Sequence, residues 1–129
     1  MVKMKVTVGT DIIEVSRVED AMKDSKFAER VFTNNEIRYC ESKGAMKYQH
    51  YAARFAAKEA AFKAISNKLV NKYDIGWKNI ETTNDESGRP MIEIVDIDLD
   101  STGLNIIKLD LSISHIKDFA TATVVAAEE

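Results

Sequence analysis

Hydrophobic residues in the first half of the chain recur at two different periods. Residues 4–8 alternate methionine and valine with lysine and threonine, which predicts a half-buried strand. Apolar residues at helical spacing then predict three short helices, and the third opens with the capping-box pair Thr33 and Glu36 and ends near residue 42. The longest expected helix covers residues 45–65, because no glycine or proline interrupts that stretch.

The second half of the chain changes to the two-residue period of strands. Residues 74–83 and 90–99 are strand-like, and the turn-rich segment NDESGRP joins them. Residues 106–114 alternate apolar and polar side chains, and residues 120–127 form an expected last strand. Helices that come before a run of antiparallel strands predict an α+β fold, with the N-terminal strand and helices packed on a mainly antiparallel sheet.

Composition limits the possible class of protein. The 129 residues contain one proline and no linker-like tract, so we expect a single domain over residues 1–129. The net charge of -3 disfavours non-specific binding to nucleic acid or to an anionic membrane. The one cysteine, Cys40, has no partner for an internal disulfide, which favours a reducing cytoplasm. The N-terminal segment resembles neither a signal peptide nor a membrane span.

The long helix carries the first candidate chemistry. At 100° per residue, Phe55, Glu59 and Phe62 share one side, and Lys63 lies one turn beyond Glu59, while alanines gather on the opposite face. An exposed Glu–Lys pair at this spacing is common and adds about 0.2–0.5 kcal/mol of helix stability. The alternative is a site for a metal ion and phosphates, and the helix alone leaves both open.

Two further features of the sequence are compatible with such a site. Asp11 ends the first expected strand and precedes two isoleucines, so its carboxylate must be paired, metal-bound or turned outward. The simpler interpretation is that Asp11 or Thr10 caps the helix that starts near Glu14. His115 follows two serines that alternate onto one strand face, and a lone histidine in that position is usually incidental.

Taken together, these features resemble the holo-acyl-carrier-protein synthases, which are the short bacterial-type 4′-phosphopantetheinyl transferases. Gly9-Thr10-Asp11 is followed in the family's order by FAERVFTNNE, RFAAKEAAFKA, GRP and SISH, and the resemblance runs from about Val6 to Val125. The resemblance implies the 4′-phosphopantetheinyl transferase fold and transfer of 4′-phosphopantetheine from coenzyme A to a serine of apo-acyl carrier protein. The other product is 3′,5′-ADP, and the pathway implied is fatty acid biosynthesis.

The resemblance also implies roles for the charged residues. Asp11 and Glu59 match the acids that bind Mg²⁺, and Lys63 matches a lysine that offsets charge on the diphosphate; these are the expected catalytic residues. Mg²⁺ prefers one or two carboxylates together with phosphate oxygens and waters. Arg54 and His115 match positions along the phosphates of the coenzyme, including the 3′-phosphate.

The remaining matches concern a further lysine and the carrier protein. Lys58 belongs to the same helical motif and is grouped with the coenzyme-binding residues, with a purely structural role as the alternative. Arg17 and Phe27 match contacts to the acidic helix of the carrier protein, although acidic neighbours dilute the basic patch there. The family's usual assembly is a homotrimer with each site between two subunits. Ile116 follows His115 where some members have a polar or acidic residue.

Two other function classes compete with the enzyme. A non-catalytic module of the same fold could bind coenzyme A or a carrier protein, but a binder has no need to keep Asp11, Glu59 and Lys63 together. A sheet that binds nucleic acid needs exposed aromatic residues among basic ones, whereas Trp77 in the strand region has acidic neighbours. Intact mass of an apo carrier protein after incubation with coenzyme A and Mg²⁺ separates these classes.

Overall fold

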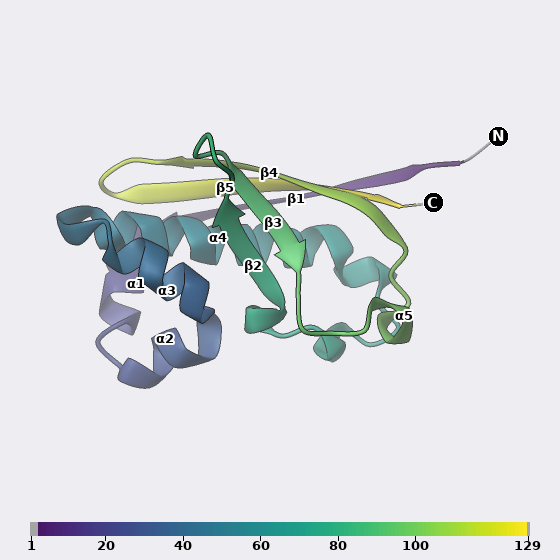
Figure 1. Ribbon diagram of the computed structural model, residues 1–129, viewed down its shortest axis with the longest axis horizontal. Helices are drawn as coiled ribbons and strands as arrows, with labels where there is room; N and C mark the ends of the chain where they lie inside the picture. Colours follow the sequence, from purple (N-terminus) through teal and green to yellow (C-terminus); the bar gives the residue numbers. More distant parts are fainter. Residues whose placement is uncertain (1–2, 129) are drawn as a thin grey trace.

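In the computed structural model, which describes residues 3–128, a long helix lies along a three-stranded sheet, and the short helices between residues 15 and 41 gather at one end (Figure 1). The helices are α1 (Val15–Ala21), α2 (Ser25–Val31), α3 (Asn34–Glu41), α4 (Lys47–Ile65) and α5 (Leu99–Thr102). The strands are β1 (Lys5–Glu14), β2 (Ile80–Asn84), β3 (Pro90–Ile94), β4 (Ile106–His115) and β5 (Phe119–Glu128). Short 3₁₀ turns are η1 (Gly44–Met46), η2 (Ser66–Lys68), η3 (Lys72–Asp74) and η4 (Trp77–Asn79).

The strands form two antiparallel sheets. One sheet has the order β1-β5-β4, and the other is the hairpin of β2 and β3. This arrangement confirms the α+β prediction and divides the four late strands between the two sheets. The capping box is also confirmed, because the Thr33 hydroxyl accepts from the Glu36 amide and the Glu36 carboxylate accepts from the Thr33 amide.

Strand β1 is longer than the sequence predicts, and this changes the place of Asp11. The strand pairs with β5 as far as Glu14, so Asp11 lies within it, opposite Ala122. Helix α1 starts directly after Glu14 without a side-chain cap. The interpretation of Asp11 or Thr10 as that cap is therefore wrong, and the Thr10 hydroxyl instead donates to the Ala122 carbonyl.

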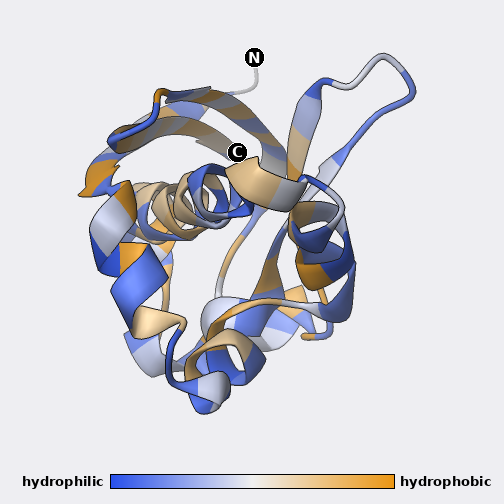
Figure 2. Cartoon of the chain, turned by 90° about the vertical axis from the view of Figure 1, so that its left-hand side faces the viewer, coloured by the Kyte–Doolittle hydropathy of each residue, from blue (hydrophilic) through white to orange (hydrophobic). Residues whose placement is uncertain are grey.

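The two faces of β1 are the reverse of the simplest expectation. Met4, Val6, Val8 and Ile12 face outward with 60–65% of their surface exposed. The face that carries Gly9 packs on α4, whose alanine side chains are small enough to let the strand approach closely. A Cβ atom at Gly9 would lie only 2.0 Å from the Ala60 carbonyl oxygen. Figure 2 shows the resulting alternation of hydrophobic and hydrophilic residues along the strands.

The core has two parts that meet along α4. One part lies between the alanines of α4 and the sheets, and the other lies between the start of α4 and the three short helices. Among the described residues, no helix combines the length and apolar character needed to cross a membrane.

Candidate active site

The close crossing of β1 over α4 brings together Asp11, Glu59 and Lys63, which lie up to 52 residues apart in the sequence. Lys63 Nζ lies 3.3 Å from Asp11 Oδ1 and donates to the Thr10 carbonyl oxygen at 3.1 Å. The Lys63 ion pair therefore bridges helix and strand. The alternative of an isolated Glu59–Lys63 surface pair does not describe this contact.

Glu59 and Asp11 form a pair of mutually repelling carboxylates. Partial burial raises the pKa of Glu59, the Asp11 charge raises it further, and Lys63 partly offsets both effects. Like charges held together beside a lysine are typical of sites that bind a cation or a reacting anion. No group of three or more acidic, histidine or cysteine ligands exists within residues 3–128, so any metal here would complete its coordination with substrate or water oxygens.

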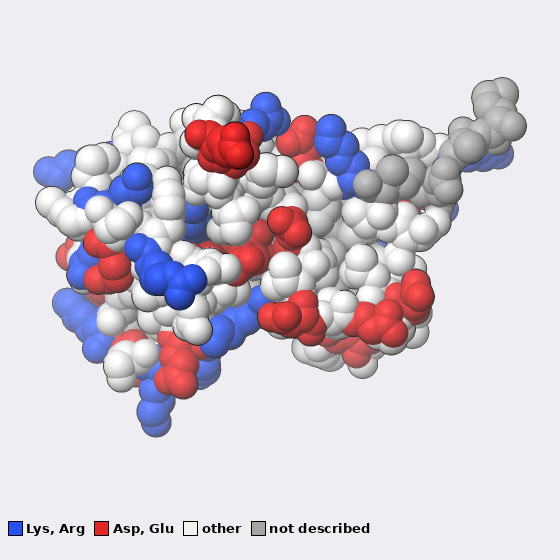
Figure 3. Space-filling model, viewed as in Figure 1, with Lys and Arg blue, Asp and Glu red and all other residues white. Residues whose placement is uncertain are grey.

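Glu59 borders two cavities. The first, of about 340 Å³, is lined by Asp11 and Glu59 together with Arg17 and Phe27. The structure therefore places both predicted carrier-protein contacts beside the two acids, on the side of α1 and α2. Figure 3 shows lysine and arginine side chains over these helices, interspersed with acidic ones.

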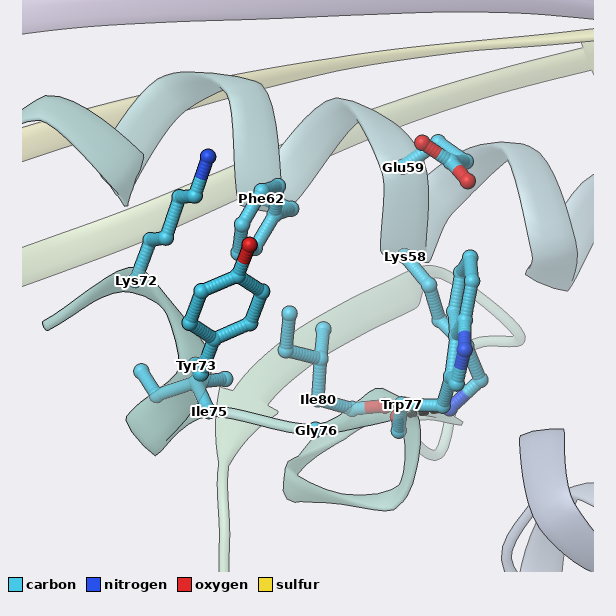
Figure 4. A pocket seen from close by; sticks show the side chains of 9 residues that line it. All are labelled: Lys58, Glu59, Phe62, Lys72, Tyr73, Ile75, Gly76, Trp77 and Ile80. Carbon is cyan, nitrogen blue, oxygen red and sulfur yellow. Dashed lines mark hydrogen bonds between the residues drawn. The ribbon is translucent and has the colours of Figure 1, made fainter.

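The second cavity, of about 370 Å³, lies on the other side of Glu59. Its walls include Phe62, Tyr73 and Trp77, and Figure 4 shows these rings around a hollow that Glu59 borders. The Trp77 ring stacks on Phe55 with a centroid distance of 5.2 Å. Because Phe55 lines the first cavity, this aromatic pair separates the two.

Arg54 lies in a different cluster, toward α3 and β2. Its side chain is only 3% exposed, its Nη2 donates to Asn84 Oδ1 at 2.7 Å, and its guanidinium lies 3.8 Å from the centre of the Tyr39 ring. Its Nε is buried and has no hydrogen-bond partner among the described residues. A buried donor without an acceptor is costly, which favours an anion as the missing partner.

His115 belongs to the same cluster. Its ring lies edge-on to His50 at 4.9 Å, and His50 in turn lies edge-on to Tyr39, the ring under Arg54. Gln49 holds His115 through Nδ1 at 2.9 Å. Burial lowers the pKa of His50 to about 4, and the positive charges around it contribute.

The sequence interpretation missed three members of this cluster, namely Tyr39, His50 and Asn84. His50 precedes Arg54 by one helical turn, so the i, i+4 spacing was available as a signal. Tyr39 and Asn84 come from other elements and have no comparable signal in the sequence.

The structure corrects the placement of Lys58 with the coenzyme-binding residues. Its side chain has no exposed surface, and its ammonium group pairs with Glu36 and donates to the carbonyls of Trp77 and Ile80. An ammonium has three donors, and all three are used inside the fold. Lys58 faces the interior because it lies about 100° around α4 from Glu59.

Comparison with known proteins places this geometry in context. The family model of the 4′-phosphopantetheinyl transferase superfamily matches residues 7–124. The chain is 42% identical over 127 residues to the holo-[acyl-carrier-protein] synthase of Ruminiclostridium cellulolyticum, which covers 95% of this chain and 92% of the relative.

Solved structures give the same result. The structure of a holo-(acyl-carrier-protein) synthase from Bacillus anthracis in complex with CoA (3′,5′-ADP) is similar with a TM-score of 0.77 and 37% identity, over 98% of this chain and 100% of that one. The Helicobacter pylori holo-[acyl-carrier-protein] synthase in complex with coenzyme A has a TM-score of 0.77 and 30% identity, over 92% of this chain and 98% of that one. The family predicted from the sequence is confirmed.

Proposed function

This chain belongs to the 4′-phosphopantetheinyl transferase superfamily, and we propose that it transfers 4′-phosphopantetheine from coenzyme A to a serine hydroxyl of apo-acyl carrier protein in the cytoplasm, for fatty acid biosynthesis. The observation that carries the proposal is the meeting of Asp11, Glu59 and Lys63 next to two cavities, both of which Glu59 borders. Those three side chains supply what the reaction of a diphosphate requires.

Asp11 and Glu59 would hold the Mg²⁺ ion. The donor set fits this ion, because Mg²⁺ takes one or two carboxylates and completes its shell with phosphate oxygens and waters. Burial is the main cause of the raised pKa of Glu59, and the Asp11 charge adds a repulsion that a divalent cation would offset. When bound, the ion neutralises negative charge on the diphosphate.

The chain's own residues position the reaction. The serine oxygen forms a bond to the phosphorus that carries pantetheine, and the phosphorus–oxygen bond to 3′,5′-ADP breaks. Lys63 donates toward the oxygens on which negative charge develops, a contribution that is largest in the transition state. Ile116 carries no ionisable group, so the serine proton would pass either to Glu59 or to a water held at the metal site.

Arg54 and His115 would hold the phosphates that do not react, including the 3′-phosphate. The unpartnered Arg54 Nε and the adjacent histidine support an anion site there. Their cluster lies toward α3 and β2, whereas Asp11 lies on β1. We therefore propose a homotrimer in which each site combines the acids of one subunit with the Arg54 cluster of its neighbour.

The carrier protein would approach the first cavity. Arg17 and Phe27 line it beside the two acids, so a carrier helix docked on α1 and α2 would present its serine to Glu59. The mixed charge of this surface suits orientation of an acidic partner more than strong attraction.

The test is the intact mass of an apo-acyl carrier protein incubated with coenzyme A, Mg²⁺ and this protein. We expect a gain of one phosphopantetheine group, which EDTA prevents. Asp11→Ala and Glu59→Ala should abolish the gain with unchanged circular dichroism, while Asp110→Ala, on an exposed ion pair with Arg89, should not. Binding of coenzyme A without any mass gain would instead support the non-catalytic module.

A further inference from the structure

Lys58 and Glu36 form an ion pair in the interior, next to the proposed reaction centre. Both side chains have no exposed surface, and Lys58 Nζ lies 2.7 Å from Glu36 Oε1. Two charges are stable away from water only where pairing and hydrogen bonds satisfy them, and loss of one partner leaves the other uncompensated. Both side chains are therefore held in place, because neither can leave the other without exposing a buried charge to an apolar interior.

Lys58 connects α4 to the segment that follows η3. Besides Glu36, its ammonium donates to the Trp77 carbonyl at 2.9 Å and to the Ile80 carbonyl, so it holds both the first residue of η4 and the first residue of β2. Figure 4 shows the Lys58 side chain extending from α4 down to this segment, while Glu59 points elsewhere.

Glu36 connects the same point to α3 and β2. Its Oε1 also accepts from the Thr33 amide at 2.9 Å, which closes the capping box, and its Oε2 accepts from the Thr82 amide at 3.0 Å. With these bonds, every donor of the ammonium and both oxygens of the carboxylate have partners.

The held segment forms a wall of the site. Trp77 lines the second cavity together with Glu59, and its ring stacks on Phe55, which lines the first cavity. A shift of Trp77 would therefore change both cavities that Glu59 borders.

We propose that Lys58 and Glu36 are positioning residues, which fix the Trp77–Ile80 segment against α4 and thereby the walls around Glu59. The inference concerns the walls of the same site and rests on the proposed function only for its kinetic consequence. The Lys58 ammonium has no hydrogen left to donate to coenzyme A, because all three are bonded within the fold.

The first test uses the chain's single tryptophan, Trp77, as a reporter that needs no activity. Lys58→Met alone should lower the melting temperature strongly, because it leaves Glu36 charged and buried. Lys58→Met/Glu36→Gln should recover much of that loss. In the folded double variant we expect a red-shifted Trp77 emission and stronger acrylamide quenching, since its carbonyl is released. The matched control is Lys68→Met/Glu128→Gln, which removes a largely buried pair at 2.8 Å elsewhere and should leave both signals unchanged.

The second test is the kinetic split in the double variant. We expect kcat to fall by about 10- to 100-fold through misplacement of the walls, with KM for coenzyme A changed by about twofold or less. Native Trp77 emission and quenching in the double variant would overturn the proposal, and so would an unchanged kcat with a raised, salt-dependent KM. If the native protein transfers nothing, the proposed function fails, but the fluorescence comparison still decides whether the pair positions Trp77.

Discussion

Neighbouring residues on one helix have different roles because they point in different directions. Glu59 and Lys63 face β1 and meet Asp11, whereas Lys58 faces the interior and pairs with Glu36. Arg54 lies on the Lys58 side and reaches β2. The four charges of the motif thus divide into two beside Asp11, one in a buried ion pair with Glu36 and one held against Asn84 and Tyr39.

The first prediction follows from this division. Lys63→Ala should lower kcat with little change in KM for coenzyme A, because the role proposed for Lys63 is to stabilise charge that develops during transfer. The activation free energy should rise by about 2.7–4 kcal/mol. Arg54→Ala should chiefly raise KM, since the role proposed for Arg54 is to hold a phosphate that does not react.

Steady-state kinetics with a fixed carrier protein and varied coenzyme A measure both effects. Lys47→Ala, which removes a lysine from the start of the same helix, is the control and should change neither parameter. Equal effects of Lys63→Ala and Arg54→Ala on both parameters would mean that α4 acts as one undifferentiated basic surface.

His50 gives a prediction on pH and stability. Its pKa of about 4 in the folded protein lies below the ordinary value of 6.5, because burial and then the charge of His115 disfavour the protonated ring. The unfolded chain therefore takes up the proton first as pH falls. The stabilisation is complete above about pH 6.5 and is lost as pH falls toward 4.

Water screens the partly exposed His50 ring. We therefore expect the free energy of unfolding to fall by about 1–2 kcal/mol, which is less than the pKa difference alone would give. Urea unfolding of the native protein and of His50→Gln at pH 7 and pH 5 measures it. The variant should lose less stability between the two pH values, and parallel losses would show that His50 does not titrate as its surroundings suggest.

Among the elements, the crossing of β1 over α4 determines whether the site exists. Gly9 allows the strand to approach, the Thr7 hydroxyl donates to the Ala64 carbonyl at 2.7 Å, and the two acids meet beside this contact. Strand and helix make this contact along a row of alanines, so the spacing is set by backbone rather than by adaptable side chains.

Gly9→Ala should therefore damage stability and activity together. The new Cβ would lie 2.0 Å from the Ala60 carbonyl oxygen and 2.8 Å from the Ala64 amide nitrogen, and neither backbone can move aside. We expect a loss of about 1–3 kcal/mol or more in unfolding free energy, and reduced transfer even where the variant is folded. Thermal unfolding is the measurement. Gly76→Ala is the matched control, because its Cβ would meet only Asn79 at 3.6 Å; a comparable loss there would remove the argument from close approach.

Sequence periodicity predicted the elements better than it predicted their faces. The long helix, the Thr33 capping box, the β2–β3 turn and the last two strands follow from local signals. The strands expected over residues 74–83 and 90–99 are wrong in part, because the first begins only at Ile80, after η4, and the second ends at Ile94. The length of β1 and the outward direction of its valines do not follow from local signals, because both depend on how closely Gly9 approaches α4. For the same reason Asp11, Glu59 and Lys63 could be grouped only through family resemblance. A structural role for Lys58 was an open alternative, but its partner could not be predicted, since Glu36 comes from another helix.

At the scale of the whole molecule, the outward face of β1 is an exposed apolar surface. Met4, Val6, Val8 and Ile12 form an exposed apolar row on the edge strand of a sheet, a feature that soluble proteins usually cover. Assembly of identical chains would cover it and would also bring the Arg54 cluster of one subunit toward the acids of another. A single assembly of identical chains would then both cover the apolar row and complete the site.

The last prediction tests this shared site by mixing two inactive variants. Asp11→Ala removes an acid, Arg54→Ala weakens the phosphate contact, and each should transfer poorly alone at low coenzyme A. In a homotrimer refolded or co-expressed from equal amounts, about one quarter of the interfaces would join an intact acid pair to an intact Arg54, so part of the native activity should return.

The required control is the same mixture combined after each variant has assembled, which should recover activity only as fast as subunits exchange. Sedimentation of Val6→Lys/Val8→Lys supplies the complementary measurement. These side chains are solvent-exposed in the single chain, so the substitutions should leave its fold intact but separate the subunits and abolish transfer. A fully active monomer would contradict a site between subunits. So would mixtures whose transfer activity never exceeds the summed activities of the two variants, because Asp11 and Arg54 of one chain would then serve the same coenzyme.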